Sequence, residues 1–228
     1  MTIKPSSLLA GLSLLLLLCL VRPSTTNGAA ADGSVEGTIR VVKDGKTAAV
    51  ASSVVVYLKS VPTTKRASTG KHVIRQRDLQ FSPRISAVVK GATVEFPNDD
   101  KVFHNVFSAS RPARFDLGLY RNGGSKSVDF KREGVVDVFC NIHPEMSSRV
   151  LVVPTHHFTV PDAKGKFRID GIPPGTYPIV AWHANGAEAT GTVTIEAGKA
   201  ASVKLEVEER AKSTEHRRKD GTPYGRYE

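Results

Sequence analysis

Three side chains that can bind a soft metal ion lie within seven residues of one another. Cys140, His143 and Met146 offer a thiolate, an imidazole and a thioether, and they stand between two strand-like segments, GVVDVFC and RVLVV. A second imidazole, His104, lies 36 residues upstream in PNDDKVFHNVF. Two imidazoles, one thiolate and a weakly held thioether suit a single copper ion as Cu(I) or Cu(II). We therefore predict one copper ion bound by His104, Cys140, His143 and Met146.

Each of these residues also has a simpler explanation when it is taken alone. A histidine on a surface loop, a buried inert thiol and a buried methionine are all common. The sequence contains two cysteines, and Cys19 falls in the N-terminal apolar run, which leaves Cys140 as the lone thiol of the rest. The chemical match of four residues, together with an export signal, favours the metal site over four separate coincidences.

Residues 1–31 have the pattern of a secretory signal peptide. Lys4 precedes a leucine-rich run of about 15 residues, which is shorter than the roughly 20 needed to span a bilayer as a helix. Small residues at 29 to 31 offer a cleavage position, although an uncleaved anchor is the alternative. We expect a periplasmic or secreted protein of about 197 residues, without a transmembrane span once the signal is removed.

The charge balance is positive but partly local. The formal net charge is +10, and removal of Lys4 and Arg22 with the signal would lower it to +8. Residues 209–228 are rich in Lys and Arg and contain no Val, Ile, Leu or Phe, so they are predicted to be a disordered basic tail. We expect no nucleic-acid partner, because this tail is not part of a folded nucleic-acid-binding domain and the protein is expected to be exported.

The remaining sequence predicts an all-β protein. Thirteen short segments rich in Val, Ile, Phe and Thr alternate with Gly, Pro, Asn and Asp, and none has a helical period. Polar seams near residues 61–71 and 154–161 separate a central module from two flanks. We expect the flanks, 32–60 and 155–208, to pair as a second small β-sandwich around the central module, 71–154. The first strands could alternatively join the central sandwich.

The central segment resembles the cupredoxins, the family of small blue copper proteins with a Greek-key β-sandwich. The resemblance covers QFSPRISAVVKGATVEFPNDD, HNVFS and FDLGLY, and the Cys-to-Met spacing is similar to that of amicyanin. It implies that His104 and His143 supply nitrogens, Cys140 the sulfur and Met146 the axial ligand. It also implies that Asn105, after the first histidine, ties the two ligand-bearing loops together from outside the ligand set.

The same resemblance implies how electrons would enter and leave. In such folds the second histidine usually reaches the surface, which makes His143 the expected electron port. Around it, Ile142, Pro144 and Phe107 could form an apolar docking patch for protein redox partners.

The flanks resemble a second family, the carboxypeptidase regulatory-like or transthyretin-like β-sandwich modules. The resemblance lies in DAKGKFRIDGIPPGTYPIVAWHANG and, for the first strands, in GSVEGTIRVVKDGKTAAVASSVVVYLK. It implies a structural or interaction module without a catalytic site.

Four functions are compatible with these features. The leading prediction is an exported type 1 copper protein that transfers single electrons and is not an enzyme. The alternative is copper binding or delivery without redox turnover. A Cys140 nucleophile activated by a histidine is a third, but no residue that would orient the histidine is evident. A structural adhesin built on the flanking module is the fourth.

Overall fold

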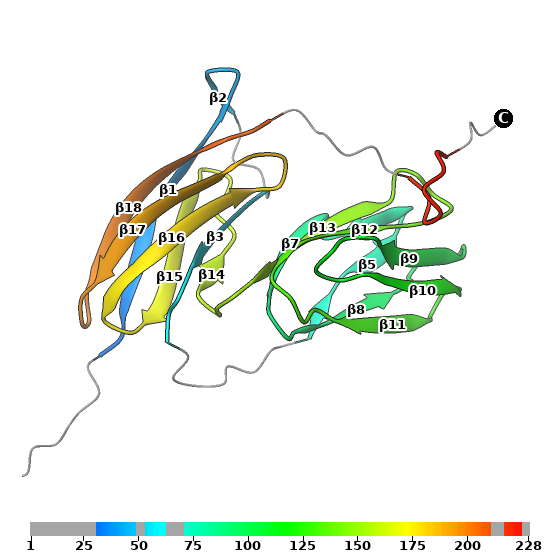
Figure 1. Ribbon diagram of the computed structural model, residues 1–228, viewed down its shortest axis with the longest axis horizontal. Coiled ribbons are helices and arrows are strands. Elements are labelled where there is room, and N and C mark those ends of the chain that lie inside the picture. The colour runs from blue at the N-terminus through cyan, green and yellow to red at the C-terminus, as the bar shows by residue number, and fades with distance from the viewer. Residues whose placement is uncertain (1–30, 49–52, 63–70, 211–216, 225–228) are drawn as a thin grey trace, which may run out of the picture.

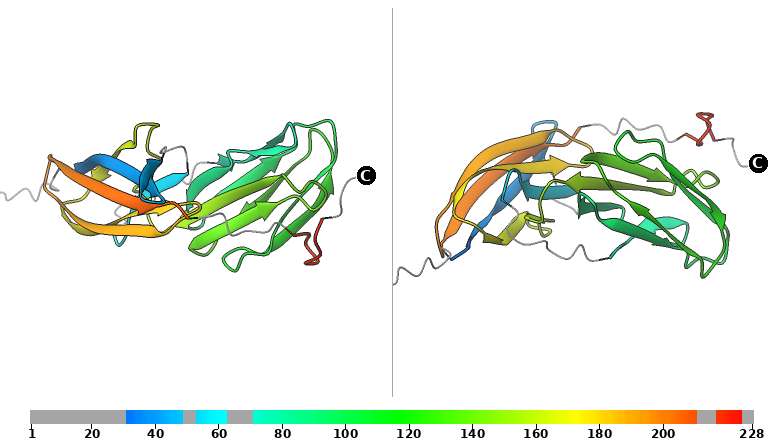
Figure 2. Two further views of the ribbon diagram at one scale, coloured as in Figure 1. Left: turned by 90° about the horizontal axis from the view of Figure 1, so that it is seen from above. Right: turned by 60° about the horizontal axis from the view of Figure 1, so that its bottom comes forward.

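The computed structural model describes residues 31–48, 53–62, 71–210 and 217–224, and within them the protein is all-β. Two β-sandwiches lie end to end, with the C-terminal segment beside the far end of one of them (Figures 1 and 2). Among these described residues, no helix has the length and apolar character that a membrane crossing requires. The expected signal peptide lies outside them apart from Ala31.

The central sandwich consists of ten strands. One sheet has the order β10-β9-β12-β13-β7, a second has the order β11-β8-β4, and β5 pairs with β6 as a hairpin. The strands are β4 (His72–Val73), β5 (Arg75–Arg77), β6 (Gln80–Ser82), β7 (Ile85–Val89), β8 (Thr93–Pro97), β9 (His104–Ser108), β10 (Phe115–Tyr120), β11 (Ser125–Asp129), β12 (Gly134–Phe139) and β13 (Ser147–Val153).

Alternation of apolar residues explains the core of this sandwich. Val136 and Val138 on β12 point inward with Val150 and Val152 on β13, while the residues between them are mostly less buried. Phe96, Phe130 and other side chains of the second sheet close the same apolar cluster. Cys140, the free cysteine of the described residues, belongs to this cluster. The core therefore extends to the end of the sandwich that contains the candidate ligands.

β10 is a strand that the sequence pattern did not predict. Its register against β9 shifts between Asp116 and Leu119, and Gly118 in the shift has a φ of +65°. The apolar residues of this segment alternate, but Asp116 and Gly118 between them are disfavoured in strands, which weakens the strand signal.

The flanking sandwich is built from both ends of the described chain. One sheet has the order β15-β1-β18, with β2 also paired to β1, and the other has the order β14-β3-β16-β17. Its strands are β1 (Gly33–Lys43), β2 (Lys46–Ala48), β3 (Val54–Leu58), β14 (Phe158–Thr159), β15 (Lys166–Ile172), β16 (Gly175–His183), β17 (Glu188–Ile195) and β18 (Ala200–Glu208).

The N-terminal strands pair with C-terminal strands rather than with the central sandwich. β1 runs parallel to β18 over nine residue pairs, and β3 is antiparallel to β16. Gly37 permits the close approach of β1, because a Cβ there would lie 2.1 Å from the carbonyl oxygen of Val203. Val35, Val56 and Ile179 share one buried cluster, in which both flanks contribute to one core.

The two sandwiches share a third apolar cluster. Val55 and Trp182 from the flanking sandwich pack with Leu151 and Val153 from β13. All five residues of β3 are therefore buried, since this strand faces its own core on one side and the central sandwich on the other. This contact fixes β13, which begins directly after the loop that contains the candidate ligands.

Candidate metal centre

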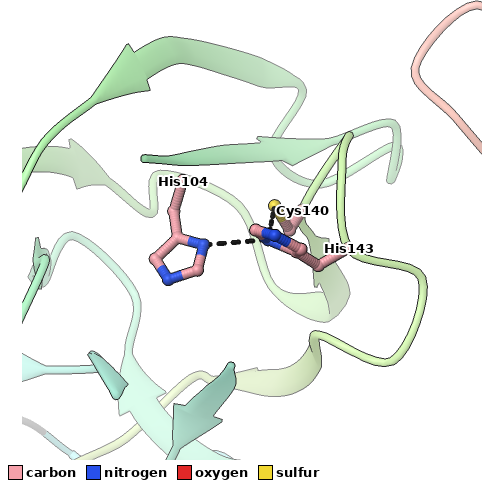
Figure 3. A group of neighbouring side chains, drawn as sticks. All are labelled: His104, Cys140 and His143. Carbon is pink, nitrogen blue, oxygen red and sulfur yellow. Dashed lines mark hydrogen bonds between the residues drawn. The ribbon is translucent and has the colours of Figure 1, made fainter. Parts of the chain in front are cut away.

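Three of the four predicted ligands present their donor atoms to one point. Nδ1 of His104 lies 3.0 Å from Nδ1 of His143, and Nδ1 of His143 lies 3.6 Å from Sγ of Cys140. The donor atoms of the three residues all lie within 4.8 Å of one another (Figure 3). Among the described residues, this is the group of His, Cys, Asp or Glu side chains that could hold a metal ion.

Two separate segments supply these donors. His104 is the first residue of β9 and is completely buried, whereas Cys140 and His143 belong to the ligand loop, residues 140–146, between β12 and β13. The loop is closed by two backbone hydrogen bonds of 3.2 Å, from the N–H of Cys140 to the carbonyl of Met146 and from the N–H of Met146 to the carbonyl of His143. The sheet order β9-β12-β13 brings the segments together.

Met146 is completely buried in the same apolar cluster as Cys140. Its backbone closes the ligand loop, which places the residue beside the three-donor group. Its role as the axial ligand stays a prediction.

Asp100 is a site residue that the sequence analysis did not identify. Its Oδ2 accepts a hydrogen bond of 2.7 Å from Nε2 of His104, on the opposite side of the imidazole ring from the donor group. The carboxylate is held in turn by the backbone N–H groups of Asp78, at 2.6 Å, and Leu79, at 3.0 Å. Both of these residues have positive φ angles at the tip of the β5–β6 hairpin, which turns their N–H groups toward Asp100. The proton of His104 is therefore directed to Nε2, and Nδ1 is left with a lone pair for a metal.

The thiol of Cys140 lies among hydrogen-bond donors at the edge of an apolar core. Burial alone would raise the pKa of the thiol, but the interaction with the imidazole of His104 and hydrogen bonds from the backbone N–H groups of Asn105, Ile142 and His143 lower it overall. These donors stabilise the thiolate, which is the form that binds a metal. The surroundings of the sulfur therefore favour the protonation state that ligation needs.

The pKa values of the two imidazoles shift in opposite directions. Burial lowers the pKa of His104, but hydrogen bonds to Cys140 and Asp100 raise it overall. Burial, followed by the charge of His104, lowers the pKa of His143. A lowered pKa keeps His143 neutral near pH 7, so that it can act as a ligand.

Three large apolar side chains on or beside the ligand-bearing segments are exposed. Ile142 is 38% exposed, Phe103 55% and Leu119 57%, and each lies next to or within a ligand-bearing segment or on its paired strand. Phe107, which was expected to contribute to this patch, is only 4% exposed, and its ring lies 5.9 Å from that of Phe139. It pairs with Phe139 of β12, and its orientation could not be inferred before this strand register was known.

Asn105 forms contacts of two kinds. Its backbone N–H supports the Cys140 sulfur, while its side-chain Nδ2 donates a bond of 2.7 Å to Oδ1 of Asp116 on β10. The carbonyl oxygen of the Asn105 side chain is buried and has no hydrogen-bond partner among the described residues. The side chain is thus directed to β10, and its predicted role of tying the ligand loops together stays a prediction.

Part of the basic tail is placed against the ligand loop, which differs from the expected disorder of residues 209–228. Glu209 pairs with Gly186, and residues 217–224 lie beside the loop between β12 and β13 (Figure 1). Residues 211–216 and 225–228 lie outside the described part of the chain. Hydrophobicity did not predict this contact, because it is made by hydrogen bonds and an ion pair.

One of these tail contacts gives a prediction for pH dependence. The hydrogen bond from Lys219, supported by bonds from the N–H of Gly118 and the side chain of Asn105, lowers the pKa of Asp116 to about 2 although burial raises it. Because a depressed carboxyl pKa adds stability above the unfolded value of about 3.9, this contribution should be complete above about pH 5 and lost as the pH falls toward 2. Denaturant titrations of the wild type and Asp116→Asn should differ at pH 6 and converge near pH 2. A difference that persists at pH 2 would contradict the assignment.

One family model matches part of the chain. Residues 157–203 match "Polysaccharide lyase family 4, domain II", which covers most of β14 to β18 and less than half of the chain. A search of curated proteins gave no match.

Solved structures that match part of the chain include copper proteins. A Cu-containing nitrite reductase (NirK) from Thermus scotoductus SA-01 matches with 22% identity and a TM-score of 0.36 over 37% of this chain, which spans 23% of the reductase chain. A purple cupredoxin from Nitrosopumilus maritimus matches with 26% identity and a TM-score of 0.33, over 36% of this chain and 99% of that one. The reduced Cu(I) form of an amicyanin mutant matches with 21% identity and a TM-score of 0.35, over 43% and 98% of the two chains. TM-scores below 0.5 leave the function to be argued from the site itself.

Proposed function

We propose that this protein is an exported type 1 copper protein that transfers single electrons between redox partners. The observation that supports it most directly is the convergence of two imidazole Nδ1 atoms and one thiolate sulfur from two chain segments. Histidines and a cysteine without a common ligand would not be expected to direct their donor atoms to one point at the end of a sandwich core.

The residues fit a single copper ion. Metal bonds to nitrogen and sulfur in proteins measure about 2.0 to 2.3 Å, so donors that share one ion lie about 3 to 4 Å apart. The separations of 3.0 Å between the imidazoles and 3.6 Å from His143 to the sulfur fall in this range. A soft thiolate with two imidazoles selects copper over hard cations, and a nearby Met supplies the weak fourth ligand. Bound copper would supply a one-electron Cu(I)/Cu(II) couple.

The chain's own residues would keep the ligands in place during electron transfer. Asp100 fixes the ring of His104, the backbone bonds of the ligand loop fix Cys140, and the shared core prevents large movement. His143 is the less buried of the two imidazoles and stands beside exposed Ile142, which makes it the proposed exit for the electron. Redox proteins with an apolar contact surface are the proposed partners.

The chain is proposed to act as a carrier and not as an enzyme. His104 is hydrogen-bonded to a carboxylate through Nε2, and its Nδ1 lies 3.0 Å from Nδ1 of His143. The convergence of both imidazoles and the thiol fits ligation better than activation of a nucleophile. Copper delivery without redox turnover is the competing outcome of the test below.

The test is the optical and paramagnetic resonance spectrum of the full chain expressed in the periplasm with copper. We expect one copper per chain, an intense blue or green thiolate-to-copper absorption, and reversible bleaching by a reductant. A colourless, readily exchanged Cu(I) site would favour copper delivery, and absence of copper binding would refute both functions.

A further inference from the structure

The C-terminal clamp segment, residues 217–224, contacts the ligand loop directly and, through Asp116 of β10, is linked to the segment that contains His104. On the ligand loop, the backbone N–H of Lys219 donates a bond of 2.8 Å to Oδ1 of Asn141. The hydroxyl of Tyr224 donates to the backbone carbonyl of Cys140. Two residues of the clamp segment therefore bind the loop at the ligand cysteine and at its neighbour.

A second contact, from Lys219 to Asp116 of β10, links the clamp segment indirectly to the segment of His104. Nζ of Lys219 lies 2.6 Å from Oδ2 of Asp116, whose Oδ1 accepts the bond from the Asn105 side chain. Asn105 directly follows His104. Lys219 thus joins the ligand loop, through its backbone, to the β9–β10 pair, through its ammonium group.

The clamp segment has a defined shape of its own. The N–H of Arg218 donates to the carbonyl of Thr222, and the N–H of Gly221 donates to the carbonyl of Arg218, both at 2.9 Å. Gly221 has a φ of +85°, a conformation that favours glycine at such a turn. The Arg218 guanidinium lies 5.6 Å from the centre of the Tyr224 ring. A preformed turn loses less conformational freedom when it binds, which makes weak contacts effective.

We propose that the clamp segment positions the ligand loop, with Lys219 and Tyr224 as positioning residues that hold Cys140 in register with His104. This inference rests on the proposed copper site for its functional meaning. The clamp would join the same two segments that Asn105 is predicted to tie together, and both Lys219 and the Asn105 side chain bind Asp116. The apolar side chains of Ile142 and Leu119 remain exposed with the clamp in place, so the clamp leaves these candidate docking residues open.

Amide hydrogen exchange of the full mature chain without copper tests the clamp directly. The reporters are the N–H groups of Cys140 and Met146, which close the ligand loop, and Val152 in the central core serves as the reference. Tyr224→Phe removes one hydroxyl and should speed reporter exchange about three- to tenfold, and a chain that ends at Arg210 should speed it by more than about tenfold. Exchange at Val152 should not change.

Two further variants separate the specific contact from a general loss of charge. Lys219→Met should speed reporter exchange, and Lys219→Arg should restore much of the protection because it keeps the cation beside Asp116. Lys199→Met is the matched control, since Lys199 pairs with Glu196 on the flanking sandwich. It should leave the reporters unchanged.

The copper-loaded chain gives a second, functional readout. Removal of the clamp should accelerate the loss of Cu(I) to a chelator several-fold and shift the thiolate-to-copper absorption band. Unchanged reporters in the truncated chain, or equal acceleration at Val152, would overturn the clamp. Because exchange is measured without copper, failure to form a blue site would overturn the proposed function and leave the clamp result standing.

Discussion

Replacement of Cys140 by serine should abolish the intense visible absorption of the copper-loaded protein. The absorption requires charge transfer from a thiolate sulfur, and a serine hydroxyl neither ionises near neutral pH nor matches the softness of copper. The substitution is small and Cys140 is buried at the edge of the core, so folding should be retained. Absorption and paramagnetic resonance spectra with copper analysis measure the result.

A control variant should separate loss of the ligand from nonspecific effects of mutation. His156 lies outside the three-donor group, and His156→Asn should keep the full absorption. Retention of the blue colour in Cys140→Ser would exclude a type 1 site at this position. Loss of colour in His156→Asn as well would point to damage of the fold instead.

The Asp100→Asn variant should bind copper about 10- to 100-fold more weakly, equivalent to about 1.4 to 2.7 kcal/mol. The carboxylate accepts hydrogen bonds from His104 and from the N–H groups of Asp78 and Leu79. An asparagine amide of the same shape offers one acceptor oxygen, and its NH₂ group would face one of these donors. The ring of His104 would then lose its fixed orientation and tautomer.

Asp99→Asn provides the matched control for this prediction. Asp99 is the preceding residue and pairs with Arg75 at 3.0 Å, on the exposed side of the same loop. Exposed ion pairs contribute little, so this variant should bind copper like the wild type. Competition with a copper chelator of known affinity measures both, and equal affinities for Asp100→Asn and the wild type would show that the carboxylate does not orient the ligand.

The sequence alone was sufficient for the all-β class and for three of the residues that meet at the candidate site. The segments GVVDVFC and RVLVV were predicted as strands on either side of the ligand loop, and they are observed as β12 and β13, which pair with each other. The three-residue spacing from Cys140 to His143 could be interpreted because donors so close in a tight loop must remain close in space. Local patterns of this kind depend on neighbouring residues, which the sequence states directly.

Contacts between distant segments were decided only by the tertiary structure. Asp100 became part of the site through the tip of the β5–β6 hairpin, and Lys219 and Tyr224 through the fold of the tail onto the ligand loop. The burial of Phe107 beside Phe139 depended on the register of β9 with β12. A residue's type gives its chemical capacity, but its partner is set by how sheets pair and pack across long stretches of chain, and no local pattern of hydrophobicity or spacing encodes that pairing.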